Sequence, residues 1–90
     1  MSDNIYKQTI EKWGEPLQII VAIEEMSELT KALTKWFRQQ TTKSKICEEI
    51  ADVEIMLEQL RIMFDDSNKV DYFKRQKIKR LDNEIHKTED

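Results

Sequence analysis

The chain has 90 residues, of which 39% are hydrophobic and 37% are charged, and its formal net charge at pH 7 is −3. A chain of this length predicts a single domain over residues 1–90, and its nearly balanced charge argues against nucleic acid or an anionic membrane as a partner. One glycine and one proline are too few for a sheet with many hairpins, and one cysteine excludes an intramolecular disulfide.

Apolar residues recur at helical spacing along the chain, which predicts an all-α fold of helices joined by short polar turns. The expected helices span residues 3–14, 16–39, 45–64 and 69–87. Asp3 or Asn4 is expected to cap the first helix, and Gly14 is expected to end it. Pro16 suits the first turn of the second helix. The last residues, from Thr88 to Asp90, are expected to fray.

The second expected helix carries two acids in the middle of an otherwise apolar row. The row consists of Leu17, Val21, Glu25, Glu28 and Ala32, at spacings of four, four, three and four. Burying ionised carboxylates without partners is costly, so either this row faces water or a positive group lies beside it. Further apolar residues are expected to bury the neighbouring faces and to leave the acids close to the interior: Ile20, Ile23, Leu29, Leu33, Trp36 and Phe37.

The third and fourth expected helices differ in their faces. The predicted seam of the third helix alternates spacings of four and three, which suits antiparallel packing: Ile46, Ile50, Val53, Leu57, Leu60 and Phe64. Glu49 and Asp52 would border this seam on the side of Met56. The fourth helix has a basic face, made of Lys74, Arg75, Lys77, Lys79 and Arg80. The candidate caps are Ser44, Thr41 or Thr42 for the third helix and Ser67 or Asn68 for the fourth.

Two acidic pairs have the same spacing. Glu25 and Glu28 are three residues apart, as are Glu49 and Asp52, and each pair is preceded by a further glutamate. Residues three apart lie on one helix face, so two such faces that meet would gather four carboxylates in one small volume. Only cations make that arrangement tolerable, and all-oxygen ligands favour Mg²⁺, with Mn²⁺ as a substitute. The alternative is a solvated charged face, since acids are abundant in this chain.

The runs from Gln18 to Leu29 and from Glu48 to Val53 resemble the motif of the MazG-like all-α nucleoside triphosphate pyrophosphohydrolases, in which ExxE is followed, after a spacer, by ExxD. Twenty residues, 29 to 48, separate the two halves here. The resemblance implies a four-helix bundle that assembles as a homo-dimer or homo-tetramer. It also implies a house-cleaning enzyme that cleaves nucleoside triphosphates between the α and β phosphates, giving a monophosphate and pyrophosphate.

The resemblance also assigns roles to the acids. Glu25, Glu28, Glu49 and Asp52 would be the ligands of Mg²⁺, so Glu25 counts among the candidate catalytic residues. Helix geometry, and not the resemblance, makes Glu24 the other candidate: it lies about 100° around the helix from Glu25. It could act as a base for the attacking water or support the metal ligands, although it could equally pair with a surface lysine.

Candidate substrate contacts carry positive charge, an amide or an aromatic ring. Lys74, Lys77 and Arg80 could hold the β and γ phosphates, or form a solvated basic face. Lys31 could reach phosphate, or merely pair with Glu28. Gln18 and Trp13 are the candidates for holding the base, although tryptophan is more often a packing residue.

Three functional classes are compatible with these patterns. The first is the Mg²⁺-dependent pyrophosphohydrolase; the second is a protein of the same fold that binds a nucleotide or a protein without turnover; the third is a small helical adaptor. The apolar residues are more numerous than one thin bundle needs, which predicts a homo-oligomer. With no signal-peptide pattern and no apolar run of about 20 residues, we expect a cytoplasmic protein.

Overall fold

The computed structural model describes residues 2–87, with side chains from residue 5 onward, and all regular structure in this range is helical. The helices are α1 (Ser2–Trp13), α2 (Glu15–Phe37), α3 (Lys43–Phe64) and α4 (Lys69–Ile85). The predicted all-α class is therefore confirmed, and the predicted helix bounds agree to within two residues. The side chains of Asp3 and Asn4, on which the expected capping depends, and the expected fraying of Thr88 to Asp90 lie outside the part described.

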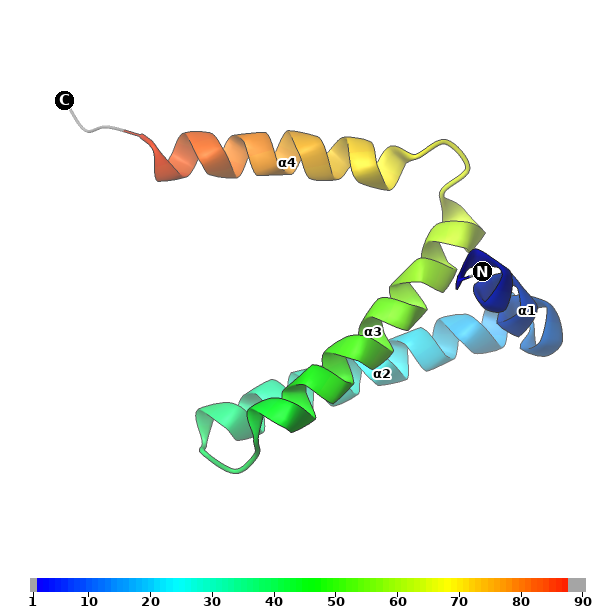
Figure 1. Ribbon diagram of the computed structural model, residues 1–90, viewed down its shortest axis with the longest axis horizontal. Coiled ribbons are helices and arrows are strands. Elements are labelled where there is room, and N and C mark those ends of the chain that lie inside the picture. Colours follow the sequence, from blue (N-terminus) through cyan, green and yellow to red (C-terminus); the bar gives the residue numbers. More distant parts are fainter. Residues whose placement is uncertain (1, 88–90) are drawn as a thin grey trace.

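The helices do not all pack together (Figure 1). α2 and α3 form an antiparallel pair, and α1 contacts both of them where α2 begins and α3 ends. α4 leaves the end of α3 at an angle and runs away from the pair, so that α3 and α4 form a V. No described residue of α4 is buried. A single chain therefore contributes three packed helices and one projecting helix.

The turns follow from a few residues whose backbone or side chain fits them. Gly14 has a φ of 87° and separates α1 from α2; this left-handed region is open to glycine at little cost. Its N–H donates to the carbonyl of Ile10 at 2.8 Å, which ends α1 as expected. Of the three candidate caps of α3, Thr42 takes the role, since its Oγ1 accepts from the backbone N–H of Lys45 at 3.2 Å.

The turn between α3 and α4 differs from the prediction. Asn68 occupies the N-cap position with a φ of 58°, but its side chain makes no capping bond. Instead the Asp65 carboxylate accepts from the N–H groups of Lys69 at 2.7 Å and Val70 at 3.0 Å. Hydrogen bonding by Val70 is the main reason that the pKa of Asp65 is lowered. Asn68 is therefore the N-cap residue, as one of the two predicted candidates, but the capping hydrogen bonds are accepted by Asp65, three residues earlier.

The interface between α2 and α3 is rotated from the predicted seam. The buried apolar residues are Ala22, Ala32, Val53 and Met56, and the buried polar residues are Gln18, Glu49 and Gln59. Glu49 thus lies in the interface, whereas Ile50, Leu57 and Phe64 are 41%, 43% and 67% exposed. The predicted seam was wrong at these three positions. Apolar residues occur on two sides of α3, and the small alanines of α2 select the side on which the backbones approach closely.

The outer side of α2 is apolar and uncovered. Leu17 and Glu28 of the predicted row face outward, while Gln18 and Ala22 take the inner positions. Five residues expected to be buried are exposed in the single chain: Ile20, Ile23, Leu33, Trp36 and Phe37. Leu29 is half-buried. None of the helices within residues 2–87 has the length and apolar character needed to cross a bilayer.

Candidate metal centre

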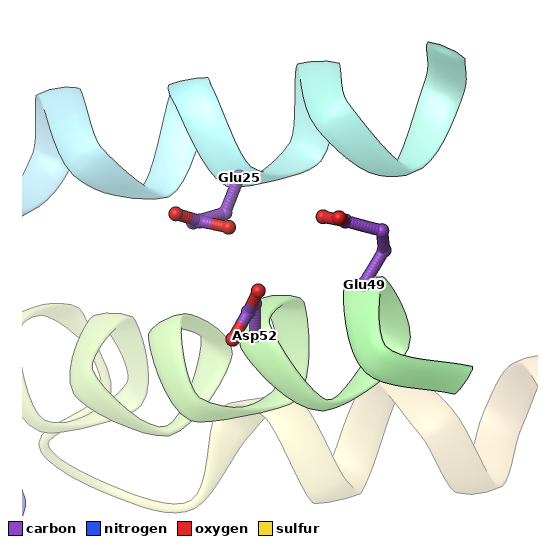
Figure 2. A group of neighbouring side chains, drawn as sticks. All are labelled: Glu25, Glu49 and Asp52. Atoms are coloured by element: carbon purple, nitrogen blue, oxygen red, sulfur yellow. The ribbon is translucent and has the colours of Figure 1, made fainter. Parts of the chain in front are cut away.

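Three acids from two helices meet in the middle of the α2–α3 pair. Glu25 comes from α2, and Glu49 and Asp52 come from α3. Each offers a carboxylate oxygen, and these oxygens all lie within 4.8 Å of one another. Figure 2 shows the three side chains pointing into the space between the helices. The spacing of three between Glu49 and Asp52 is what places both on the side of α3 that faces α2.

Burial makes this acidic centre (Glu25, Glu49 and Asp52) electrostatically costly. Glu49 is only 6% exposed, and the other two are half-buried. The pKa of Glu25 is raised, chiefly because burial removes water from its carboxyl group and then because Asp52, Glu49 and Glu28 add negative charge nearby. Both effects disfavour the ionised form. A cation placed among the three carboxylates would relieve both.

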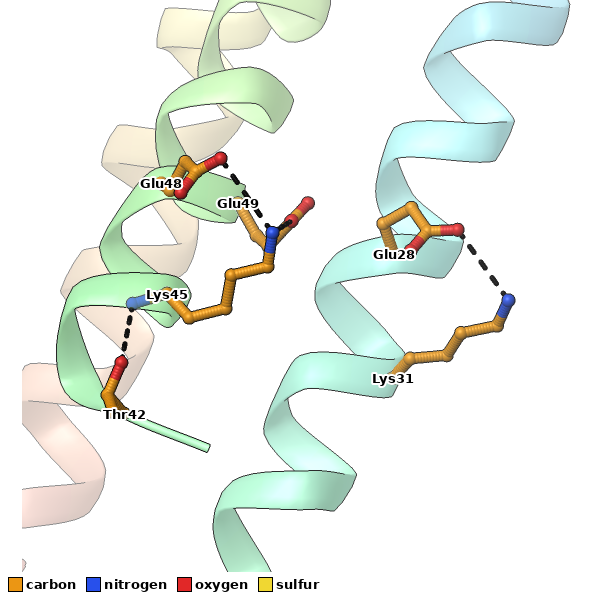
Figure 3. A network of polar contacts seen from close by, with 6 residues as sticks. All are labelled: Glu28, Lys31, Thr42, Lys45, Glu48 and Glu49. Atoms are coloured by element: carbon orange, nitrogen blue, oxygen red, sulfur yellow. Dashed lines mark hydrogen bonds and ion pairs between the residues drawn. The ribbon is translucent and has the colours of Figure 1, made fainter. Parts of the chain in front are cut away.

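One lysine already supplies part of that positive charge. Lys45, one turn before Glu49 on α3, places its Nζ 3.1 Å from Oε1 of Glu49 and 3.7 Å from Oε1 of Glu48 (Figure 3). Glu25 and Asp52 have no ion-pair partner within the described part of the chain. The ammonium group of Lys45 therefore neutralises the buried Glu49, while the negative charges of Glu25 and Asp52 have no cationic partner in the described part of the chain.

The fourth predicted ligand lies beside the centre and not within it. The side chain of Glu28 is 53% exposed, and its Oε1 is 3.6 Å from Nζ of Lys31. Glu28 is close enough to raise the pKa of Glu25, but its oxygens are not part of the three-carboxylate group. The structure thus brings three of the four predicted acids together, because the inner row of α2 passes through Glu25 and leaves Glu28 on its flank.

The other candidate residues are spread over the molecule. Glu24 is exposed on α2. Gln18 is 6% exposed and lies on the inner face of α2, two turns before Glu25. Trp13 is 52% exposed at the end of α1, with Lys12 Nζ 5.8 Å from its ring centroid. The basic candidates Lys74, Lys77 and Arg80 are exposed on α4, which diverges from the α2–α3 pair (Figure 1), and none of them belongs to the group of three carboxylates.

Two residues near the centre were missed by the predictions. Lys45 and Lys35 both line a small hollow that also includes Lys31, Glu28 and Glu49. The sequence contains a signal for Lys45, which precedes Glu49 by four residues, a spacing that favours ion pairs on a helix. Lys35 follows Lys31 by four residues and so lies on the same side of α2.

The donor set of the acidic centre fits a hard divalent cation. Three carboxylates supply only oxygen ligands, which suits Mg²⁺ or Mn²⁺ and not a thiolate-preferring metal. Mg²⁺ keeps several positions for water or phosphate oxygens and needs few protein carboxylates. The ammonium of Lys45 on the buried Glu49 also indicates that this carboxylate binds positive charge.

No protein-family model, curated protein or solved structure matches the chain. The resemblance to the MazG-like family therefore rests on the motif residues alone. Three of those residues, Glu25, Glu49 and Asp52, are the ones that the fold gathers into a single group.

The raised pKa of Glu25 gives a pH-dependent contribution to stability. Because the folded chain holds this proton more tightly than the unfolded chain, the associated stability is present below the ordinary pKa of 4.5 and is lost as the pH rises through the raised value. We expect Glu25→Gln, which cannot ionise, to gain melting temperature relative to the wild type as the pH rises, when both are measured with EDTA. Glu11→Gln on the exposed face of α1 is the control. A wild-type-to-variant difference that stays constant with pH would contradict the electrostatic interpretation.

Proposed function

We propose that this chain is a Mg²⁺-dependent nucleoside triphosphate pyrophosphohydrolase, which converts an NTP or dNTP into the monophosphate and pyrophosphate. The observation that carries the proposal is the convergence of Glu25, Glu49 and Asp52, with carboxylate oxygens within 4.8 Å of one another. Packing alone gives no reason to place three carboxylates, one of them almost fully buried, at the centre of a helix interface. The motif spacing of the MazG-like family supports the same assignment.

The chemistry needs charge neutralisation more than it needs covalent participation by the protein. A triphosphate carries about four negative charges, and the transition state for phosphoryl transfer gains mainly from positioning and electrostatic stabilisation. The bound metal would supply both, and would also lower the pKa of a bound water. The carboxylates of Glu25, Glu49 and Asp52 would hold the metal ion. In this proposal Glu24 acts as the base for the attacking water.

We also propose that the active form is a homo-oligomer. A compact protein of 10.8 kDa exposes about 5,500 Å², whereas this chain exposes 7674 Å². The excess, about 2,200 Å², is larger than the roughly 800 Å² that each partner contributes to a standard interface. An oligomer of copies of one chain would bring the projecting α4 against another subunit.

A second copy is the occupant that fits the hollow of the V. This hollow has a volume of about 1040 Å³ and is lined mainly by α3 and α4. On the α3 side it presents Ile55 and Leu57 together with Glu54 and Glu58. Beyond the residues that line the hollow, α4 carries the complementary combination of exposed apolar and basic side chains: Lys77, Ile78 and Leu81.

The decisive experiment is a panel of standard and modified NTPs and dNTPs, assayed for pyrophosphate with Mg²⁺ and, in parallel, with EDTA. We expect equal amounts of monophosphate and pyrophosphate from at least one nucleotide, and none with EDTA. Binding of Mg²⁺ and a non-hydrolysable triphosphate without turnover of any substrate would favour the non-catalytic nucleotide-binding alternative. If the two ligands fail to enhance each other's binding, a plain helical interaction module is the better description.

A further inference from the structure

A small hollow next to the acidic centre is lined by three lysines. It lies between the second half of α2 and the first half of α3, with the connecting turn at its edge. Its volume is about 130 Å³, which is room for about four water molecules and therefore for phosphoryl oxygens, though not for a nucleoside. Lys31 and Lys35 line it from α2 and Lys45 from α3, together with Gln40 and Thr41 of the turn and the carboxylate of Glu28, which is paired with Lys31.

This hollow shares a wall with the acidic centre. Glu49 belongs both to the hollow and to the group of three carboxylates. Positive and negative side chains thus meet at Glu49, whose Oε1 lies 3.1 Å from Nζ of Lys45 on the same helix (Figure 3). A cation bound by the carboxylates and an anion held by the lysines would therefore touch each other, as Mg²⁺ and the phosphates of a nucleotide do.

Two of the three lysines, Lys31 and Lys35, are only lightly engaged without a ligand. Lys35 makes no ion pair among residues 5–87. Lys31 and Glu28 form an exposed pair at 3.6 Å, the kind of pair that contributes little. Lys45 is held most firmly, by the buried Glu49. A divalent cation on Glu49 would take over the role of the Lys45 ammonium and release it toward the hollow.

We propose that Lys31, Lys35 and Lys45 form the subsite for the phosphoryl oxygens of a polyphosphate, and that Lys45 exchanges Glu49 for this anion when a divalent cation binds. The identity of the polyphosphate as the end of an NTP rests on the proposed function. The subsite itself does not, since it requires only the cavity, the lysines and the shared Glu49. This subsite replaces Lys74, Lys77 and Arg80 of the same chain, which α4 carries away from the acidic centre.

Calorimetric binding of Mg²⁺ and of inorganic tripolyphosphate tests the exchange, because the two ligands should respond to one substitution with opposite signs. Lys45→Met removes the ammonium but keeps the length of the side chain. We expect this variant to bind Mg²⁺ alone about 3-fold or more tightly, since the competing cation is gone, and to bind tripolyphosphate in the presence of Mg²⁺ at least 10-fold more weakly. Lys35→Met should weaken only the second equilibrium.

Lys7→Met, an exposed lysine of α1, controls for the loss of one positive charge, and circular dichroism checks that every variant keeps its helices. The subsite is overturned if Lys45→Met and Lys7→Met bind tripolyphosphate equally well, or if the wild type does not bind it at all with Mg²⁺ present. Turnover of NTPs is scored separately. If no NTP is turned over but Lys45→Met changes the two binding equilibria in opposite directions, the proposed enzymatic function is wrong and the subsite stands. If NTPs are turned over at a rate that neither Lys45→Met nor Lys35→Met changes, the enzymatic function stands and the subsite is wrong.

Discussion

Asp52→Asn and Glu49→Gln are each expected to abolish Mg²⁺-dependent pyrophosphate release, with kcat/KM falling by more than about 100-fold. Changes to residues that merely support metal ligands already cost 10- to 100-fold, and these two carboxylates would be ligands themselves. Both substitutions keep the shape of the side chain and remove only its charge. Initial rates of pyrophosphate release at saturating Mg²⁺, with the best nucleotide of the panel, give the measurement.

Asp52→Asn, which breaks no ion pair, should be more stable than the wild type when metal is absent. Asp52→Asn removes one of three neighbouring negative charges, so the repulsion within the acidic centre decreases. In EDTA, the melting temperature of this variant should be higher than that of the wild type. Addition of Mg²⁺ should raise the melting temperature of the variant less than it raises that of the wild type. Glu11→Gln, an equal change of charge on α1, should alter neither quantity. A variant that keeps full activity, or one that loses activity only because it unfolds, would remove the support for these ligands.

Leu81→Asp on α4 is expected to convert the protein from an oligomer into a monomer of 10.8 kDa. Leu81 is 59% exposed in the single chain, and burying a leucine at an interface stabilises it by about 1.5–3 kcal/mol. Its loss alone should raise the dissociation constant by about 10- to 100-fold, and the introduced carboxylate should raise it further. Light scattering coupled to size-exclusion chromatography at micromolar concentration reports the mass.

Gln76→Asp provides the matched substitution on the polar side of α4. It introduces the same side chain into the same helix, but about 140° around the helix axis from Leu81. It should leave the mass of the oligomer unchanged. A wild-type protein that is itself a 10.8 kDa monomer at micromolar concentration would contradict the assembly directly. Dissociation by both variants would indicate that α4 responds to helix propensity and not to a specific interface.

Local sequence predicted the elements well because local chemistry decides them. Gly14 and Pro16 mark the first boundary through backbone geometry, and Thr42 marks the third helix through a capping bond. The spacing of Glu49 and Asp52 placed both acids on one face without any knowledge of the partner helix. These inferences needed only residues within one turn of each other.

The sequence did not show which face of each helix is buried. Both α2 and α3 carry apolar residues on more than one side, so periodicity alone could not show that Ala22 and Met56 are buried while Ile23 and Ile50 are exposed. The direction of α4 depends on the left-handed Asn68, and the pair between Arg61 and Asp71 at 3.1 Å holds it across the turn. The two residues are ten apart in the sequence, whereas helical spacing rules predict contacts only between residues three or four apart.

Because α4 packs against little of its own chain, its stability as a helix depends on contacts with another subunit. A helix of 17 residues without a covered face is only marginally stable in water, and the Asp65 carboxylate and one ion pair are its main attachments to the rest of the chain. Dilution to separate subunits would therefore let this arm unravel and open its many basic positions to trypsin-like proteases. In the proposed assembly, unassembled copies would therefore be cut within this arm sooner than assembled ones.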